Sequence, residues 1–257
     1  MRDILQLSKQ EFFRWLKDQM EKRAFVYGLC FDKESMKKEL YQLLFMEQRL
    51  TAAEIEQHFI PFGQAGYLSP RQKFELMLFV LEKDYGDSCL MLKEMKVRTA
   101  ITSEEIESEY LQWLLEERVY LSEEEKKEFF VQNLMDALGL GVFEVLKRAA
   151  PNGFFVGELC PPMYENENVL KRIAVYVHGT VVRLPFLEMI SKEELVRNIK
   201  YALVMEKKGE LTMLEPILDF VKEDGTCITA VRPPAGKDWG IRILYNTSGK
   251  DGQGWNK

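Results

Sequence analysis

Two arginines near the C-terminal end of this 257-residue chain are the side chains best suited to bind a ligand. Arg232 and Arg242 lie just after or within three β-prone runs between Ile217 and Tyr245. A guanidinium group is planar, and it pairs with two oxygens of a phosphate or carboxylate at once. An arginine on the outward face of an edge strand, however, is usually only solvated. The spacing of these residues alone leaves both interpretations open.

Other side chains that carry out catalysis or bind metals are sparse. The chain has two histidines, His58 and His178, and its four cysteines are widely separated and form no Cys-x-x-Cys pair. This pattern predicts neither a zinc site nor a disulfide framework, and it favours reduced thiols, as in the cytoplasm. His178 precedes a glycine and is predicted to be a turn or surface residue. We therefore expect no catalytic residues and no metal ligands.

Composition and charge narrow the class of protein. Apolar residues make up 46% of the chain, a fraction that is typical of domains with a packed core. The chain has 35 basic and 41 acidic side chains and a net charge of −6, so its overall charge does not favour binding to nucleic acid. The N-terminus lacks the order of a signal peptide. The longest apolar run, Leu76 to Leu81, is far shorter than the roughly 20 residues that span a bilayer. These features predict a cytoplasmic protein without membrane insertion, with a peripheral location at the inner face of the cell membrane as an alternative.

The first 150 residues have the pattern of six or seven helices. Asp32 is predicted to cap one of them, and the segment from Asp87 to Ile101 fits either a helix extension or an irregular connection. Apolar residues recur at helical spacing and are expected to form a shared core, with a partner groove or ligand pocket as the alternative. Five other helix starts are predicted because serine or threonine precedes glutamate or glutamine by three residues, and they begin at Ser8, Thr51, Ser69, Thr102 and Ser122.

After Leu138 the apolar period changes from helical to two. A strand is predicted from Phe154 to Leu159, a hairpin from Ile173 to Leu184, and a helix that begins after Ser191. Three strands then follow between Ile217 and Tyr245. Asp224 and Gly225 predict a type I′ turn between the first two of these strands, because Asp-Gly tolerates the positive φ that this turn requires.

This order of elements predicts an α+β protein with two domains. Residues 1–150 are expected to form an N-terminal all-α helical bundle. Residues 151–246 are expected to form a small antiparallel sheet with one covering helix, a PAS-like domain, and residues 247–257 a polar linker or tail.

Three segments between residues 138 and 245 resemble the N-terminal domain of the secretion ATPase superfamily, the hexameric motors of type II and type IV secretion, tight-adherence pili and conjugation. GLGVFEVLKRAAPNGFFVGEL at 139–159 is similar to that family's Gly-Leu-Gly-Pro-Leu-Glu helix and following strand. IAVYVHGTVVRLPF at 173–186, with the helix SKEELVRNIKYAL, is similar to its hairpin and helix. DGTCITAVRPP, followed by WGIRILY, resembles its Asp-Gly-Ser-Arg segment and Ile-Arg strand.

This resemblance implies a function in an assembled motor. In such proteins, arginines of the N-terminal domain approach the phosphates of ATP-Mg²⁺ bound to a RecA-like domain, and by position Arg242, Arg232 and then Arg183 are the candidates. The implied partners are further copies in a ring and inner-membrane secretion or pilus components. The cofactors, ATP and Mg²⁺, would belong to a full-length protein, and none is expected in this chain alone.

The sequence departs from the family pattern at several positions. Cys227 replaces the arginine after Asp-Gly-Ser, and Val142 replaces the proline of the helix motif. No Gly-x4-Gly-Lys-Ser/Thr loop is present, since Lys250 is followed by Asp251 and Leu244 takes the place of the first glycine. We therefore expect no ATP hydrolysis by this chain alone. Two hypotheses follow: the N-terminal region of a longer ATPase, or a complete adaptor that lacks the motor.

Overall fold

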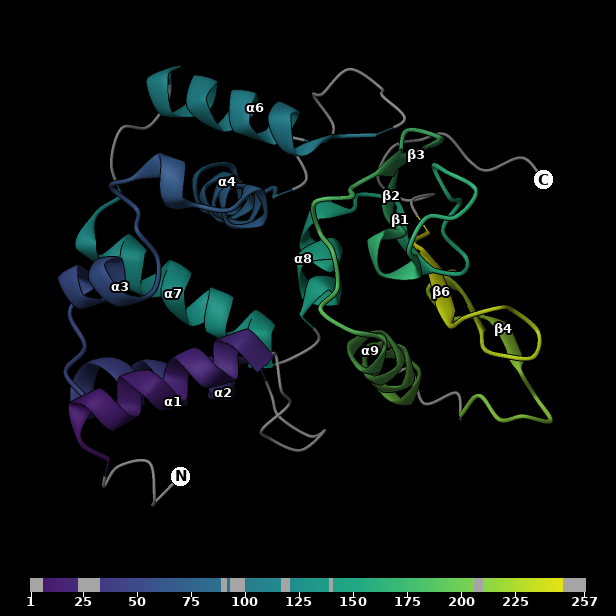
Figure 1. Ribbon diagram of the computed structural model, residues 1–257, viewed down its shortest axis with the longest axis horizontal. Coiled ribbons are helices and arrows are strands. Elements are labelled where there is room, and N and C mark those ends of the chain that lie inside the picture. Colours follow the sequence, from purple (N-terminus) through teal and green to yellow (C-terminus); the bar gives the residue numbers. More distant parts are fainter. Residues whose placement is uncertain are drawn as a thin grey trace. The chain divides into compact units, whose positions relative to one another are not determined.

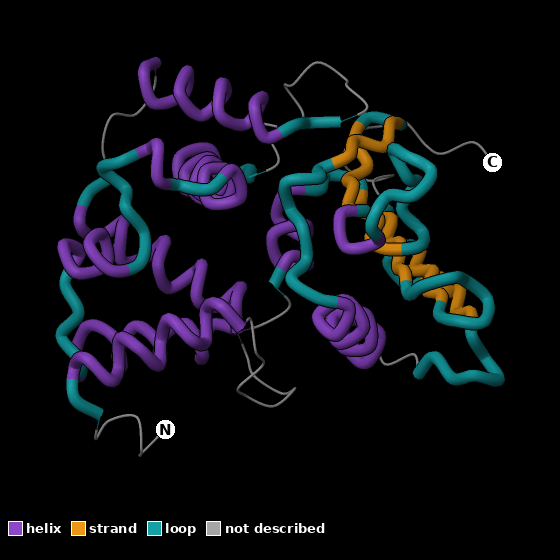
Figure 2. Tube along the Cα trace, viewed as in Figure 1, coloured by secondary structure: helices purple, strands orange, loops and turns teal. Residues whose placement is uncertain are grey.

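The computed structural model describes residues 7–22, 33–88, 92, 100–116, 121–138, 141–205 and 210–246. Within these residues the protein is of mixed α+β class, with eight α-helices and one six-stranded antiparallel sheet (Figure 1, Figure 2). The chain divides into two compact units: Met1–Phe79 with Glu107–Glu144, and Val80–Ile106 with Val145–Lys257. The segment 80–106 therefore belongs with the second unit, whereas the sequence division at residue 150 placed it in the first domain.

The helices of the first unit form around α7 (Glu123–Leu138). Helices α1 (Lys9–Lys22), α2 (Lys33–Tyr41) and α3 (Ala52–His58) all contact it. Aromatic rings occupy the core, as the ring centroids of Phe59 and Phe130 lie 5.0 Å apart and those of Phe79 and Phe129 5.4 Å apart. The other α-helices in the described residues are α4 (Pro70–Tyr85), α6 (Ser103–Glu116), α8 (Val142–Ala149) and α9 (Lys192–Met205).

The predicted apolar stripes are core, as expected from their helical spacing. Phe74, Ile106, Tyr110 and Phe129 are each at most 1% exposed. Charged residues are buried beside them on α4: the ammonium group of Lys73 pairs with Glu107 and lies 5.8 Å from the ring centre of Tyr110. Burial raises the pKa of Tyr110 to about 12. The helical spacing also predicts residues 113 and 114 to be part of this core, but their side chains lie outside the described part of the chain.

The helix starts predicted within the first 150 residues are confirmed wherever the structure describes them. At Thr51 the hydroxyl accepts a hydrogen bond from the N–H of Glu54, and the Glu54 carboxylate accepts one from the N–H of Thr51. Each bond satisfies a backbone donor that has no partner inside the helix. The same reciprocal arrangement occurs at Ser8, Ser69 and Ser122, and Thr102 pairs similarly with Glu105. Asp32, the other predicted cap, lies outside the described residues.

We expect Thr51→Ala to lower the free energy of unfolding by about 1 kcal/mol, because alanine leaves the Glu54 amide without its hydroxyl acceptor. Urea denaturation followed by circular dichroism measures this change. Gln57→Ala, an exposed position later in the same helix, is the matched control and should change stability by less than about 0.5 kcal/mol. Equal effects of the two substitutions would contradict the capping role of Thr51.

The second unit contains the sheet, whose strand order is β3-β2-β1-β6-β5-β4. The strands are β1 (Gly153–Gly157), β2 (Ile173–Val177), β3 (Thr180–Arg183), β4 (Ile217–Val221), β5 (Cys227–Val231) and β6 (Gly240–Leu244). Every pair of neighbours is antiparallel. The first and last strands are therefore joined in the centre of the sheet, and β3 and β4 form its two edges.

The two faces of the sheet differ in burial because side chains alternate along each strand. One face carries Phe154, Val156, Ile241 and Ile243, all buried, and α9 contacts β6 from this side (Figure 1). On the opposite face, the loop after β1 brings Cys160 against residues of β1 and β2, while β4, β5 and β6 remain partly or fully exposed. Two of the three candidate arginines, Arg242 and Arg183, lie on this second face.

Both predicted hairpins are present, but the type of turn at one of them differs from the sequence prediction. His178 and Gly179 form the two-residue turn between β2 and β3 with φ of 47° and 82°, the combination of a type I′ turn. The type I′ prediction at Asp224–Gly225 was wrong. Gly225 has φ of 83°, but Asp224 does not have a positive φ, as a type I′ turn would require. The N–H of Gly225 donates to the Lys222 carbonyl, and the N–H of Lys222 donates to the Thr226 carbonyl. The loop therefore has three residues, with glycine in the left-handed position. The Asp224 carboxylate instead accepts a hydrogen bond from the N–H of Thr226, which lowers its pKa.

Two further predictions concern segments at the edge of the described residues. Most of 87–101 lies outside them, but Ala100 forms a parallel bridge with Arg183, and the N–H of Ile101 donates to the carbonyl of Arg183 at 2.9 Å. The end of that segment is thus extended beside β3. Residues 247–257, predicted to be a linker or tail, are outside the described part.

No single helix among the described residues is long and apolar enough to cross a bilayer. The segments 123–137 and 142–149 reach the required length and composition only when joined across a sharp bend. Many of their apolar residues are buried within the protein, for example Phe129, Phe130 and Phe143.

Candidate functional site

Arg242 lies in the centre of the sheet and not at its edge. It is the middle residue of β6, which pairs with β1 on one side and β5 on the other. The alternative drawn from the sequence, a solvated arginine on an edge strand, is therefore wrong for this residue. Its side chain is partly exposed on the face that α9 does not cover.

A polar chain of contacts begins at Arg242 and crosses two strands. Its Nη2 donates to the Thr229 hydroxyl at 2.8 Å, and that hydroxyl donates to Asp219 Oδ1 at 2.7 Å. Among the described residues, the Arg242 Nε is buried and has no hydrogen-bond partner. The guanidinium thus donates to Thr229 and keeps one donor that no described residue satisfies.

The strand register extends this arrangement into a row across the whole sheet. Residues directly opposite one another on the same face run in the order Asp219, Thr229, Arg242, Phe155, Ala174, Arg183. Arg242 and Arg183 are three strands apart, which corresponds to roughly 14 Å at the usual strand spacing. The structure therefore brings two of the three candidate arginines onto one face but not into one binding position.

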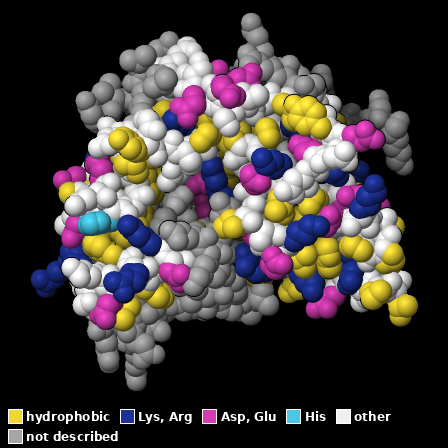
Figure 3. Space-filling model, in the orientation of Figure 1, with side chains coloured by type: hydrophobic (Ala, Val, Ile, Leu, Met, Phe, Trp, Pro, Cys, Tyr) yellow, Lys and Arg dark blue, Asp and Glu magenta, His cyan; other side chains and the backbone are white. Residues whose placement is uncertain are grey.

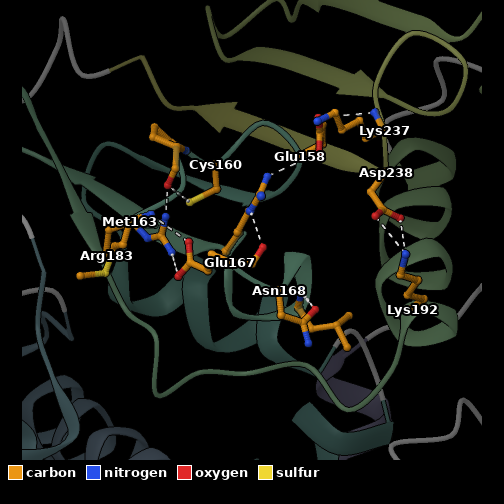
Figure 4. A network of polar contacts seen from close by, with 12 residues as sticks. Glu158, Cys160, Met163, Glu167, Asn168, Arg183, Lys192, Lys237 and Asp238 are labelled. Carbon is orange, nitrogen blue, oxygen red and sulfur yellow. Dashed lines mark hydrogen bonds and ion pairs between the residues drawn. The ribbon is translucent and has the colours of Figure 1, made fainter. Parts of the chain in front are cut away.

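Arg183 is buried, with 4% of its surface exposed. Its Nη2 forms an ion pair with Glu167 at 2.5 Å, and its Nη1 donates to the Pro161 carbonyl (Figure 4). Both partners come from the loop after β1, and the side chain of Glu167 is only 7% exposed. Arg183 thus ties this loop to the edge strand β3, and its guanidinium is directed at protein groups.

Arg232 lies just beyond β5 at the loop that contains Pro233 and Pro234. Its Nη1 donates to the Leu211 carbonyl at 3.3 Å, and its guanidinium lies 4.9 Å from the ring centre of Trp239. A cation over an indole face is attracted by the ring quadrupole. The ammonium group of Lys200 lies 5.6 Å from the same ring. Arg232 therefore holds the 232–239 loop in place. It is not part of the cross-strand row that contains Arg242.

Cys160 is packed in the small apolar cluster beneath the loop after β1. Its side chain contacts Phe155 and Ala174, and burial raises the pKa of the thiol to about 12. A thiol whose folded pKa is raised stays neutral in the native state but ionises above its ordinary pKa when unfolded. The contribution of the buried, neutral Cys160 thiol to the free energy of unfolding is therefore fully present below about pH 9, and it is lost as the pH rises above that value.

We expect iodoacetamide at pH 8.5 to alkylate Cys160 at least about a hundredfold more slowly in the native protein than in urea, because the thiolate is the reactive form. Peptide mass spectrometry after timed quenching measures the rate at each cysteine. Cys227, which is half-buried, provides an internal comparison and should show a smaller native protection. Similar native rates at the two positions would contradict the packing of Cys160.

The two histidines lie in a turn and against an aromatic ring. His178 is exposed in its turn, as predicted, and its N–H donates to Asn152 at 3.2 Å. The ring of His58 packs 5.0 Å from that of Phe13. Among the described residues, no group of three or more His, Cys, Asp or Glu side chains is arranged to hold a metal ion, and Cys160 and Cys227 are both free thiols.

Comparison with known proteins adds no family assignment. No protein family matches the chain, and no curated protein matches it.

Three residues of this region were not singled out from the sequence: Glu167, Asp219 and Trp239. Glu167 lies in a polar loop that looks solvated in the sequence, and its partner Arg183 is 16 residues away. Asp219 interrupts the apolar run of β4, which is the one local signal that could have drawn attention to it. Trp239 precedes β6 without any pattern that predicts its two cationic neighbours.

Proposed function

We propose that this chain is the N-terminal assembly and regulatory region of a secretion or pilus ATPase, with a helical bundle ahead of a PAS-like domain. In this proposal it contributes to ring formation and to the cover over a nucleotide site on a RecA-like domain. It binds inner-membrane secretion or pilus components from the cytoplasmic side and is not catalytic by itself.

The observation that carries the proposal is the placement of the three segments that resemble the family. They correspond to α8 with β1, to the β2–β3 hairpin with α9, and to β5 with β6. Because β1 lies between β2 and β6, the strands of all three segments are hydrogen-bonded neighbours in one sheet. A chance likeness of separate short segments would not require this adjacency.

Within the proposal, Arg242 is the best candidate for a phosphate contact. It is partly exposed on the face that α9 does not cover, and its Nε has no acceptor among the described residues. The buried Nε of Arg183 also has no acceptor among the described residues, but its Nη groups donate to a backbone carbonyl and pair with Glu167. Arg232 donates to the Leu211 carbonyl. Phosphate oxygens would supply acceptors that a buried donor otherwise lacks.

The coding sequence beyond residue 257 tests the proposal. We expect it to continue into a Gly-x4-Gly-Lys-Ser/Thr loop, and the purified full-length product to hydrolyse ATP in the presence of Mg²⁺. Arg242→Ala should then lower kcat at least about tenfold, while Lys171→Ala, an exposed position on the same unit, should leave it unchanged. A continuing frame without that loop, or an ATPase that is insensitive to Arg242→Ala, would contradict the proposal.

The second candidate is a stand-alone adaptor or scaffold that binds a partner in a secretion or pilus system. Strand β4 favours this alternative, because its outer edge has no strand partner among the described residues and such an edge is a binding element that requires no nucleotide. A stop codon directly after residue 257 would support the adaptor and exclude the motor.

A further inference from the structure

Strand β4 ends the sheet and exposes an apolar surface next to its open edge. We call this the β4 edge surface, and it consists of Met213, Leu214, Ile217, Asp219 and Val221. Met213 is 71% exposed, Leu214 95%, Ile217 57% and Val221 62%. Figure 3 shows hydrophobic side chains at the lower right, where the segment that leads into β4 lies in Figure 1. Long exposed apolar edge strands are uncommon in proteins that have no partner there.

The hydrogen-bond pattern of β4 shows which backbone groups are directed away from the sheet. The N–H of Arg232 donates to the Pro216 carbonyl, and the N–H of Lys222 donates to the Thr226 carbonyl. Pairs that bond to a neighbouring antiparallel strand occur at every second residue, so the even-numbered residues of β4 bond to β5. The N–H and C=O groups of Ile217, Asp219 and Val221 are therefore directed outward.

The side chains of these three residues share a face, because side chains alternate along a strand. The open edge thus combines three backbone donor and acceptor positions with an apolar–acidic–apolar pattern. The partner best matched to this edge is an extended strand whose facing positions are apolar, basic and apolar. A basic side chain opposite Asp219 would form a cross-strand pair of opposite charge.

A second copy of the chain fits this edge poorly. An antiparallel pair of β4 strands that places Ile217 opposite Val221 also places Asp219 opposite Asp219 and Glu215 opposite Glu223. Shifting the pairing by two residues in either direction places Asp219 opposite an apolar side chain. Like charges directly opposite one another destabilise a strand pair, so the charge pattern of β4 disfavours self-association through this edge.

We infer that the β4 edge surface binds an extended peptide segment of a partner protein by adding it as a seventh strand. The segment carries apolar residues at two positions four apart, with Lys or Arg midway between them. Backbone hydrogen bonds to Ile217, Asp219 and Val221 supply the affinity, and the charge of Asp219 supplies the selectivity. This inference is independent of the proposed ATPase family.

Fluorescence anisotropy with labelled peptides and the full chain tests the inference. The peptide TVTKTVT is palindromic, so it can pair with β4 in either direction, and TVTETVT is its acidic counterpart. We expect TVTKTVT to bind about two- to fivefold more tightly than TVTETVT, the effect of one cross-strand charge pair. Asp219→Lys should reverse this preference, which a nonspecific apolar contact would not do.

A proline substitution separates edge pairing from side-chain contact. Val221→Pro removes an outward N–H without removing a bond to β5, so the sheet should persist while affinity for TVTKTVT falls at least about fivefold. Val221→Thr keeps the N–H and is the matched control, with affinity expected within about twofold of the parent chain. Circular dichroism and thermal unfolding verify that both variants are folded.

Three results would overturn the inference. One is the absence of TVTKTVT binding at millimolar peptide. Another is an unchanged peptide preference in Asp219→Lys or an unchanged affinity in Val221→Pro. The third is a concentration-dependent dimer in sedimentation velocity that Val221→Pro abolishes, because that result would make a second copy the occupant of the edge.

Discussion

Glu167→Gln is expected to lower the free energy of unfolding by about 3–5 kcal/mol, because it removes one partner of a buried ion pair. The side chains of Arg183 and Glu167 are 5% and 7% exposed, and their charged atoms lie 2.5 Å apart. Glutamine has nearly the same shape as glutamate, so packing is kept while the guanidinium loses its counter-charge. The loss arises chiefly from a buried charge that is no longer compensated.

The measurement is urea denaturation of the parent chain and the variant at pH 7. The exposed pair of Lys171 and Glu188, at 3.7 Å and 49% and 45% exposed, supplies the control. Glu188→Gln should change stability by less than about 1 kcal/mol, since solvent screens exposed pairs.

A double variant distinguishes the charge effect from packing. Replacing both Arg183 and Glu167, as Arg183→Met with Glu167→Leu, removes the charges together and should be less destabilising than Glu167→Gln alone. A Glu167→Gln variant as stable as the parent chain would show that the pair does not hold the loop after β1.

Gly157→Ala is expected to lower the free energy of unfolding by about 4 kcal/mol, from two separate effects. Gly157 has φ of 70°, which an alanine adopts only with strain. A Cβ at this position would also overlap the Trp239 carbonyl oxygen and lie 3.2 Å from the Gly240 Cα. These neighbours are backbone atoms of the loop that leads into β6, so they cannot move aside as a flexible side chain would.

Gly179→Ala isolates the strain from the overlap. Gly179 has a similar φ of 82°, but a Cβ there would meet nothing within 4 Å. We therefore expect Gly179→Ala to lower stability by about 1 kcal/mol, the cost of the left-handed backbone alone. Thermal and urea unfolding of both variants give the comparison. Equal losses would show that the close approach of β1 to the 239–240 backbone is unimportant.

The sequence predicted helix starts correctly because the hydrogen bonds that begin a helix join residues within one turn. A serine or threonine three residues before glutamate satisfies helix donors through contacts inside one turn, so the pattern predicts the start without knowledge of the fold. At Ser191 the hydroxyl likewise accepts a hydrogen bond from the N–H of Glu194, and the Glu194 carboxylate accepts one from the N–H of Ile190.

Turn type was less predictable, because loop length depends on where the flanking strands end. Asp224–Gly225 and His178–Gly179 both end in a glycine of positive φ, yet the two-residue turn occurs at His178. The N–H of Lys222 pairs with the Thr226 carbonyl and fixes a three-residue loop at the other hairpin. The residues of the turn do not determine which pair closes it.

The sequence by itself determined the mixed α+β class, the helix starts and the burial of the apolar stripes, because periodicity and capping act over a few neighbouring residues. Only the tertiary structure decided the environment of each arginine, since strand order is set by contacts between segments far apart in the chain. It placed Arg242 in the interior strand β6, Arg183 in a buried pair with Glu167, and Arg232 against Trp239. In these environments Arg242 stays partly exposed, whereas Arg183 and Arg232 are held by contacts within the described part of the chain.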